Sequence, residues 1–178
     1  MNGVVTMSLN LVPDYCFNSF DEADVDFFIG NNIKGVILDI DNTLEPYENP
    51  KPGERVIAWY NRLRENGISM AIVSNNGSAR VLTFNEELGL PCFYRAKKPF
   101  SRNIRKAIAA MGLTEENVIF MGDQILTDVW GAHNAGIRAI LVPPINDKRD
   151  PFTKFKRLIE RRYIRKYNKI HEKGEEKL

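Results

Sequence analysis

Cysteine and histidine are scarce in this sequence, with two of each among 178 residues. The cysteines, Cys16 and Cys92, lie far apart, which argues against a disulfide framework and against the closely spaced cysteines of a structural zinc site. A reducing compartment is therefore the simpler interpretation.

Signals for export or membrane insertion are also missing. The first lysine or arginine is Lys34, whereas a secretory signal begins with basic residues ahead of an apolar stretch. No segment approaches the roughly 18 consecutive apolar residues that a membrane-spanning helix needs. We expect a cytoplasmic protein that at most contacts a membrane peripherally.

Charge is nearly balanced overall but unevenly distributed. The net charge is +2, yet residues 148–178 contain 12 Lys or Arg against 5 Asp or Glu. With 43% hydrophobic and 27% charged residues, the composition is that of a globular protein. The sequence predicts one folded domain over residues 1–147 and a basic C-terminal helix or tail over residues 148–178.

Short apolar segments alternate with amphipathic ones from residue 34 onward, which predicts an α/β fold. The expected strands cover residues 35–38, 68–73, 91–94, 118–121 and 137–142. The expected helices cover residues 56–63, 78–88, 101–111 and 128–135. Short connections favour one parallel sheet covered by helices on both faces. The first 33 residues are expected to pack on this body, with a short helix at about residues 21–29.

Polar residues follow three of the expected strands at the point where each strand ends. They are Asp39, Asp41, Ser74, Asn75, Asp123 and Asp128. Taken singly, each is an ordinary turn or helix-cap residue. Because ligands bind beyond the carboxyl ends of the strands in open α/β sheets, their convergence on one edge predicts a functional site.

Four short motifs, in this order along the chain, resemble those of the haloacid dehalogenase (HAD) superfamily. They are Asp39-Ile40-Asp41-Asn42-Thr43, Ser74, Lys97-Lys98-Pro99, and Gly122-Asp123 followed by Asp128. The strings around them are similar to the YqeG-like phosphatases of HAD subfamily IIIA, a group similar to the phosphatidylglycerophosphate phosphatases. The resemblance implies a HAD-like Rossmannoid three-layer sandwich with a central parallel sheet.

The same resemblance implies a Mg²⁺-dependent phosphomonoesterase that acts through an aspartyl-phosphate intermediate. Asp39 would be the nucleophile, and Asp41 would protonate the leaving alcohol and then activate water. Lys98 would offset the charge that grows in the transition state. Lys97 is a competitor for this role, although the lysine next to proline fits the motif better.

Further roles follow from the resemblance. The implied phosphate-binding residues are Thr43, Ser74 and Asn75. The implied magnesium ligands are Asp39, Asp123 and the backbone carbonyl of Ile40, with Asp128 acting through a water molecule or supporting those ligands.

No cap domain fits into the sequence. About 30 residues separate Thr43 from Ser74, and one helix and one strand occupy nearly all of them. The interval 75–98 likewise has room for one helix and one short strand. We expect an open site, which favours bulky substrates.

The leading hypothesis is that the substrate is phosphatidylglycerophosphate or a similar phospholipid head group. A phosphatase for a soluble phosphate or a phosphoprotein, and a HAD-fold scaffold that binds a partner through its tail, remain alternatives.

Apolar residues of the tail recur at helical spacing among basic ones. They are Phe155, Leu158, Ile159, Tyr163, Tyr167 and Ile170. This stripe could pack on the α/β body, or the helix could lie on an anionic membrane. Our hypothesis combines the two: the first half packs on the body and the basic face turns the open site toward anionic lipid. Nucleic acid is not an expected partner, and the oligomeric state is not predicted.

Overall fold

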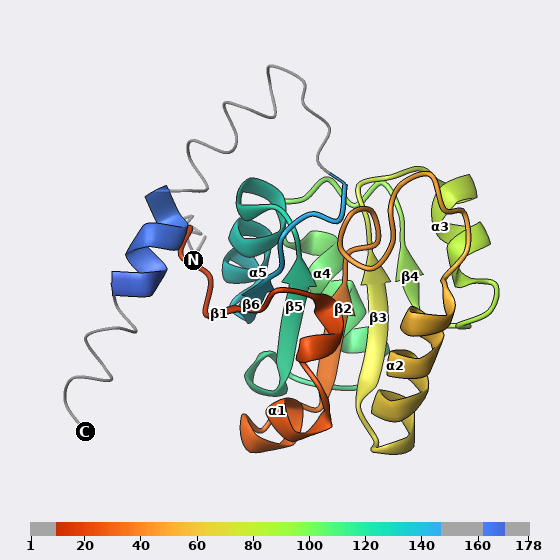
Figure 1. The fold of residues 1–178 in the computed structure, drawn as a ribbon, viewed down its shortest axis with the longest axis horizontal. Helices are drawn as coiled ribbons and strands as arrows, with labels where there is room; N and C mark the ends of the chain where they lie inside the picture. Colours follow the sequence, from red (N-terminus) through yellow and green to blue (C-terminus); the bar gives the residue numbers. More distant parts are fainter. Residues whose placement is uncertain (1–9, 147–161, 170–178) are drawn as a thin grey trace, which may run out of the picture.

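The computed structural model describes residues 10–146 and 162–169 as one parallel sheet with helices on both faces (Figure 1). The six strands lie in the order β1-β6-β5-β2-β3-β4. They are β1 (Tyr15–Cys16), β2 (Gly35–Leu38), β3 (Ser69–Val73), β4 (Cys92–Phe93), β5 (Val118–Gly122) and β6 (Arg138–Leu141). The α-helices are α1 (Val25–Gly30), α2 (Glu54–Glu65), α3 (Ser78–Asn85), α4 (Arg102–Ala110) and α5 (Trp130–Ala135). The predicted three-layer α/β fold is confirmed.

Strand β2 lies at the centre of the sheet, between β5 and β3, and every one of its residues is buried. Its side chains alternate between two separate cores, since Ile37 belongs to one cluster and Val36 and Leu38 belong to the other. A strand covered on both faces is apolar at every position, which explains its continuous hydrophobic run. Asp39 is therefore the first polar residue after a rigid, buried element.

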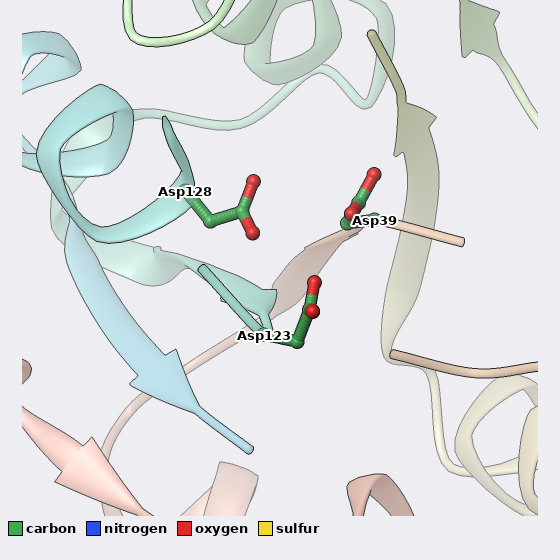
Figure 2. A group of neighbouring side chains, drawn as sticks. All are labelled: Asp39, Asp123 and Asp128. Carbon is green, nitrogen blue, oxygen red and sulfur yellow. The ribbon is translucent and has the colours of Figure 1, made fainter. Parts of the chain in front are cut away.

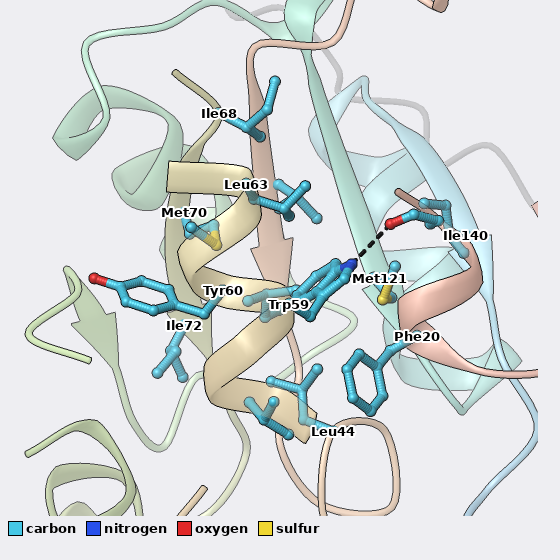
Figure 3. Close-up of a cluster of buried hydrophobic side chains, with 14 of the residues drawn as sticks. Phe20, Leu44, Trp59, Tyr60, Leu63, Ile68, Met70, Ile72, Met121 and Ile140 are labelled. Atoms are coloured by element: carbon cyan, nitrogen blue, oxygen red, sulfur yellow. Dashed lines mark hydrogen bonds between the residues drawn. The ribbon is translucent and has the colours of Figure 1, made fainter. Parts of the chain in front are cut away.

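The core on one face is centred on helix α2 (Figure 3). Trp59 and Tyr60 are buried there, and the polar group of each donates a hydrogen bond to a backbone carbonyl. The Trp59 indole N–H donates to the Ala23 carbonyl at 2.8 Å, and the Tyr60 hydroxyl donates to the Leu88 carbonyl at 2.9 Å. The Trp59 contact attaches the segment before β2 to the body.

The N-terminal segment also contributes an edge strand that the sequence did not predict. Strand β1 pairs in parallel with β6, but it has only two residues and shows no periodicity. Asp14, just before it, accepts hydrogen bonds through Oδ2 from the backbone N–H of Ala139 at 2.8 Å and pairs with His133 Nε2 at 2.9 Å. His133 Nδ1 lies 2.8 Å from the Asn10 carbonyl oxygen. Both ring nitrogens thus face acceptors, which is the arrangement of a protonated imidazole.

Stability should depend on pH through this pair. Burial alone would lower the His133 pKa, but the hydrogen bonds to Asp14 and Asn10 outweigh it and the pKa is raised above 6.5. The stabilisation is then complete below about pH 6.5 and is lost as pH rises through the raised pKa. We expect His133→Gln to cost roughly 0.5–1 kcal/mol at about pH 6 and less at about pH 9, a small value because water screens the partly exposed Asp14. Denaturant unfolding at both pH values tests this, and an equal cost at both would contradict it.

Part of the predicted C-terminal helix lies within the described residues. Residues 162–169 are helical, and Tyr163 is partly buried against the cluster on the second face. The rest of the predicted tail, residues 148–161 and 170–178, lies outside the described residues. In the part of the chain that the structure describes, no helix is both long enough and apolar enough to cross a membrane.

Candidate active site

The loop after β2 is a tight turn built on one carbonyl oxygen. The Ile40 carbonyl accepts hydrogen bonds from the backbone N–H groups of Thr43, Leu44 and Glu45 at 3.1, 2.9 and 3.2 Å. A carbonyl oxygen has two lone pairs, and these three bonds already engage them. They argue against the Ile40 carbonyl as a magnesium ligand, a role that stays a prediction.

Three carboxylates converge beyond the carboxyl ends of the central strands (Figure 2). Asp39 follows β2, Asp123 follows β5, and Asp128 lies in the π-helix η3 (Ile125–Val129). All three are buried, and one oxygen of each lies within 4.8 Å of the others. This geometry suits a divalent cation, because carboxylate oxygens are the preferred ligands of Mg²⁺.

Lys98 forms ion pairs with two of these carboxylates. Its Nζ lies 2.8 Å from Asp39 Oδ1 and 2.7 Å from Asp128 Oδ1, and its side chain is 2% exposed. The ammonium also lies 5.2 Å from the centroid of the Phe120 ring, a cation–π distance. The neighbouring Lys97 is exposed. Of the two lysines, only Lys98 reaches the carboxylates.

Negative charge in the cluster exceeds what Lys98 neutralises. Burial raises the pKa of Asp39 to about 7, with Lys98 acting in the opposite direction and Asp128 adding to the increase. Burial and the charges of Asp128 and Asp39 raise the pKa of Asp123 well above its ordinary value. These carboxylates resist ionisation because they are buried with too little positive charge nearby. A bound divalent cation would therefore stabilise their ionised forms.

Asp128 is held in place by its own backbone loop. Its Oδ2 accepts the Gln124 N–H at 3.0 Å, and the Thr127 hydroxyl donates to its Oδ1 at 3.3 Å. The π-helix that carries it is a rare conformation, often found at functional sites. Gly122 allows the close approach, because a Cβ built there would lie 2.5 Å from the Asp128 Cβ.

A methyl group at position 122 should therefore damage the site. We expect Gly122→Ala to displace Asp128, weaken its ion pair with Lys98 and lower activity about 10–100-fold, the usual effect of losing a residue that supports a metal site. Gly30→Ala is the matched control, since nothing lies within 4 Å of its added Cβ. Steady-state kinetics of both variants test the prediction; wild-type kinetics for Gly122→Ala would contradict it.

The predicted phosphate-binding residues line the same edge of the sheet. Ser74 is buried, and its hydroxyl oxygen accepts the Asn76 N–H at 3.1 Å. Thr43 donates to Asp123 Oδ1 at 3.3 Å. The side-chain amide of Asn75 forms two hydrogen bonds with the backbone of Lys98. Its Oδ1 accepts the Lys98 N–H at 2.7 Å, and its Nδ2 donates to the Lys98 carbonyl at 3.3 Å. Asn75 thus positions Lys98, and a role in phosphate binding would fall to its backbone N–H.

Asp41 is held by two residues that the sequence analysis missed. Arg80 Nε lies 2.9 Å from Asp41 Oδ1, and Asn76 Nδ2 donates to Asp41 Oδ2 at 2.6 Å. Asn76 directly follows the predicted site residues Ser74 and Asn75, so its position in the sequence is a signal for a role in the site. Arg80 lies in α3, and no motif marks it.

The ordered carboxylates and the lysine match a known family. The family model for haloacid dehalogenase-like hydrolases matches residues 16–142. The chain belongs to this family. It is 41% identical over 133 residues to "Probable phosphatase YqeG" of Bacillus subtilis (strain 168), covering 75% of this chain and 77% of that protein. Within the family the chain is a phosphatase.

A more distant curated relative and a solved structure also match the chain. A glyceraldehyde 3-phosphate phosphatase of Pyrococcus abyssi is 26% identical over 108 residues, and the match spans 56% of this chain and 44% of that enzyme. Among solved structures, a HAD phosphatase from Thermococcus onnurineus superposes with a TM-score of 0.54 at 15% identity, covering 67% of this chain and 90% of that chain. This likeness shows the fold alone.

Proposed function

We propose that the protein hydrolyses phosphomonoesters with Asp39 as the nucleophile. The observation that carries the proposal is the buried Asp39 carboxylate, which is fixed at the end of β2 and paired with Lys98. A carboxylate so held can attack phosphorus, displace the alcohol and form an acyl phosphate, which water then hydrolyses. Splitting the reaction in two lets one side chain, Asp41, protonate the alcohol first and deprotonate the water afterwards.

The surrounding groups fit the phosphoryl oxygens. Lys98 supplies positive charge next to the nucleophile, where negative charge increases in the transition state. Among the described residues, the backbone N–H groups of Ile40, Asp41 and Asn75 have no hydrogen-bond partner. We propose that these donors, with Ser74, hold the phosphoryl group.

The carboxylate cluster fits Mg²⁺. Asp39 and Asp123 would bind it, and Asp128 would support them while it orients Lys98. The Asp41 carbonyl accepts no hydrogen bond from the described residues, so it replaces the Ile40 carbonyl as the backbone ligand in this proposal. When bound, the ion would neutralise the substrate's phosphoryl oxygens. Binding can be followed without turnover, because Mg²⁺ should raise the unfolding temperature of the wild type and should do so much less for Asp123→Asn.

The substrate we propose is a phospholipid head group such as phosphatidylglycerophosphate. Among the described residues, several exposed large hydrophobic side chains lie in loops that follow strands β2, β4 and β6. They are Tyr47, Tyr94, Phe100 and Ile145, which are 49%, 44%, 64% and 46% exposed. Exposed basic residues, Arg95 and Lys97, lie in the same loops. Apolar side chains mixed with cations around an uncapped site suit an anionic lipid surface.

A substrate screen with purified protein and Mg²⁺ tests this choice. It compares phosphatidylglycerophosphate in anionic vesicles with sugar phosphates, nucleotides and a phosphopeptide. Preference for the lipid is expected, and Phe100→Ser with Tyr94→Ser should reduce lipid turnover but not that of an aryl phosphate. Ile29→Ser is the control, because Ile29 is 60% exposed on α1, at the other end of the sheet (Figure 1). Preference for a soluble phosphate would overturn the lipid proposal and leave the phosphatase.

The basic tail completes the proposal. We propose that residues 1–147 form the phosphatase domain and that residues 148–178 add positive charge beside it. Removing the residues after 166 and neutralising Arg161, Arg162 and Arg165 should weaken binding to anionic vesicles, and the difference from the wild type should be largest at low salt, where charges are least screened. Unchanged binding would show that the tail is not the lipid contact.

A further inference from the structure

Asp41, the general acid and base of the proposed mechanism, is fixed in orientation by hydrogen bonds to both of its carboxylate oxygens. Each oxygen of the Asp41 carboxylate has its own partner: Arg80 Nε at 2.9 Å and Asn76 Nδ2 at 2.6 Å. The two side chains approach from the segment that follows β3, whereas Asp41 follows β2. Their contacts therefore link the loop after β2, which carries Asp39 and Asp41, to the segment after β3 that includes the start of α3.

Arg80 is itself held in place. Its Nη1 donates to the Pro50 carbonyl at 2.9 Å, and its guanidinium lies 5.3 Å from the centroid of the Phe84 ring. The Arg80 side chain is only 11% exposed and that of Asp41 only 16%. A partly buried arginine fixed at three points is a precise support, whereas an exposed ion pair contributes little.

We propose that Arg80 is a positioning residue that holds Asp41 where it can protonate the leaving alcohol. This inference rests on the proposed function and adds a residue to it. Arg80 acts through Asp41 and forms no bond to the reacting atoms. Proton transfer requires the carboxylate to lie within hydrogen-bond reach of the leaving oxygen, so a displaced Asp41 would lose most of its effect.

Leaving-group dependence separates this role from a merely structural one. An alkyl phosphate expels an alkoxide that needs a proton, whereas a nitrophenyl phosphate expels a stable phenolate that hardly does. We expect Arg80→Gln to lower kcat/KM on the order of 10²-fold for an alkyl phosphate and only a few-fold for the nitrophenyl ester. Arg80→Lys should recover part of the loss, because it keeps the charge but not the planar guanidinium.

Two comparisons complete the experiment. The double variant Asp41→Asn/Arg80→Gln should be no slower than Asp41→Asn alone, because Arg80 works through Asp41. Arg55→Gln is the matched control, because Arg55 lies on the exposed surface of α2 and is likewise paired with an aspartate, Asp21. The kinetics of this variant should equal those of the wild type. Unfolding midpoints check that each variant folds; should Arg80→Gln fail to fold, Arg80→Lys decides through the same ratio of substrates.

The outcomes are distinct. Selective loss on the alkyl ester with a non-additive double variant supports the positioning role. Equal losses on both esters, or wild-type kcat/KM for Arg80→Gln, would overturn it while the wild type remains an active phosphatase. A wild type that hydrolyses neither ester would overturn the proposed function and the role of Arg80 with it.

Discussion

Asp39→Asn should show no turnover above a control without enzyme, on any phosphomonoester and with saturating Mg²⁺. An amide is a poor nucleophile and a poor ligand for a hard cation, so the substitution removes both proposed functions of Asp39. The variant should nevertheless fold. Lys98 keeps its ion pair with Asp128, and the cluster loses one of its three like charges.

Release of phosphate, followed together with far-UV circular dichroism and an unfolding midpoint, checks this expectation. Asp26→Asn is a suitable control, since Asp26 is exposed on α1 and should leave turnover unchanged. A folded Asp39→Asn variant with more than trace activity would show that another group attacks the phosphorus.

Lys98→Met should lose both activity and stability. It leaves two buried carboxylates, those of Asp39 and Asp128, without their cationic partner. Removing one member of a buried ion pair costs about 3–5 kcal/mol, because the remaining charge is desolvated and unpaired. Turnover should fall by at least about 10²-fold, the typical effect of losing one preorganised electrostatic partner. Saturating Mg²⁺ should restore part of the stability, since it would supply the missing positive charge.

Lys97→Met provides the matched control, as it removes the adjacent but exposed lysine. We expect wild-type turnover of a soluble ester and an unchanged unfolding free energy. Comparable losses in the two variants would contradict the assignment of Lys98, whereas losses confined to Lys98→Met would support it.

The fold could be predicted from the sequence wherever burial dictated composition. The run from Gly35 to Leu38 is apolar at each position because both faces of β2 are covered, and the four longer strands β2, β3, β5 and β6 were recognised by such runs and their turns. The two-residue edge strand β4 was predicted as part of residues 91–94. Strand β1 could not be recognised. It has two partly buried residues, and its pairing with β6 depends on contacts such as that between Asp14 and His133.

Residues of the candidate site can be named from the sequence where one residue type is chemically required. Asp39, Asp123 and Lys98 were named because carboxylates and a lysine are needed near a phosphoryl group, and the structure brings them together. A backbone ligand such as the Ile40 carbonyl is hard to predict, because the direction of a backbone group depends on the turn, which the sequence pattern does not specify; in the structure this carbonyl accepts three backbone hydrogen bonds. Arg80 was missed for a related reason: its contact joins Asp41, in the loop after β2, to helix α3, and the two residues are 39 positions apart in the sequence.

The most direct test of the account is to look for the phosphoryl group on Asp39. Wild-type protein and Asp41→Asn are mixed with substrate and Mg²⁺, quenched in acid within the first turnover and digested for mass spectrometry. The peptide containing Asp39 should carry one phosphoryl group at that residue. With a nitrophenyl phosphate as substrate, whose leaving group hardly needs a proton, its phosphorylated fraction should be larger in Asp41→Asn, because water is then activated slowly. Turnover of substrate with no phosphoryl group on Asp39, or with the group on another residue, would contradict the account.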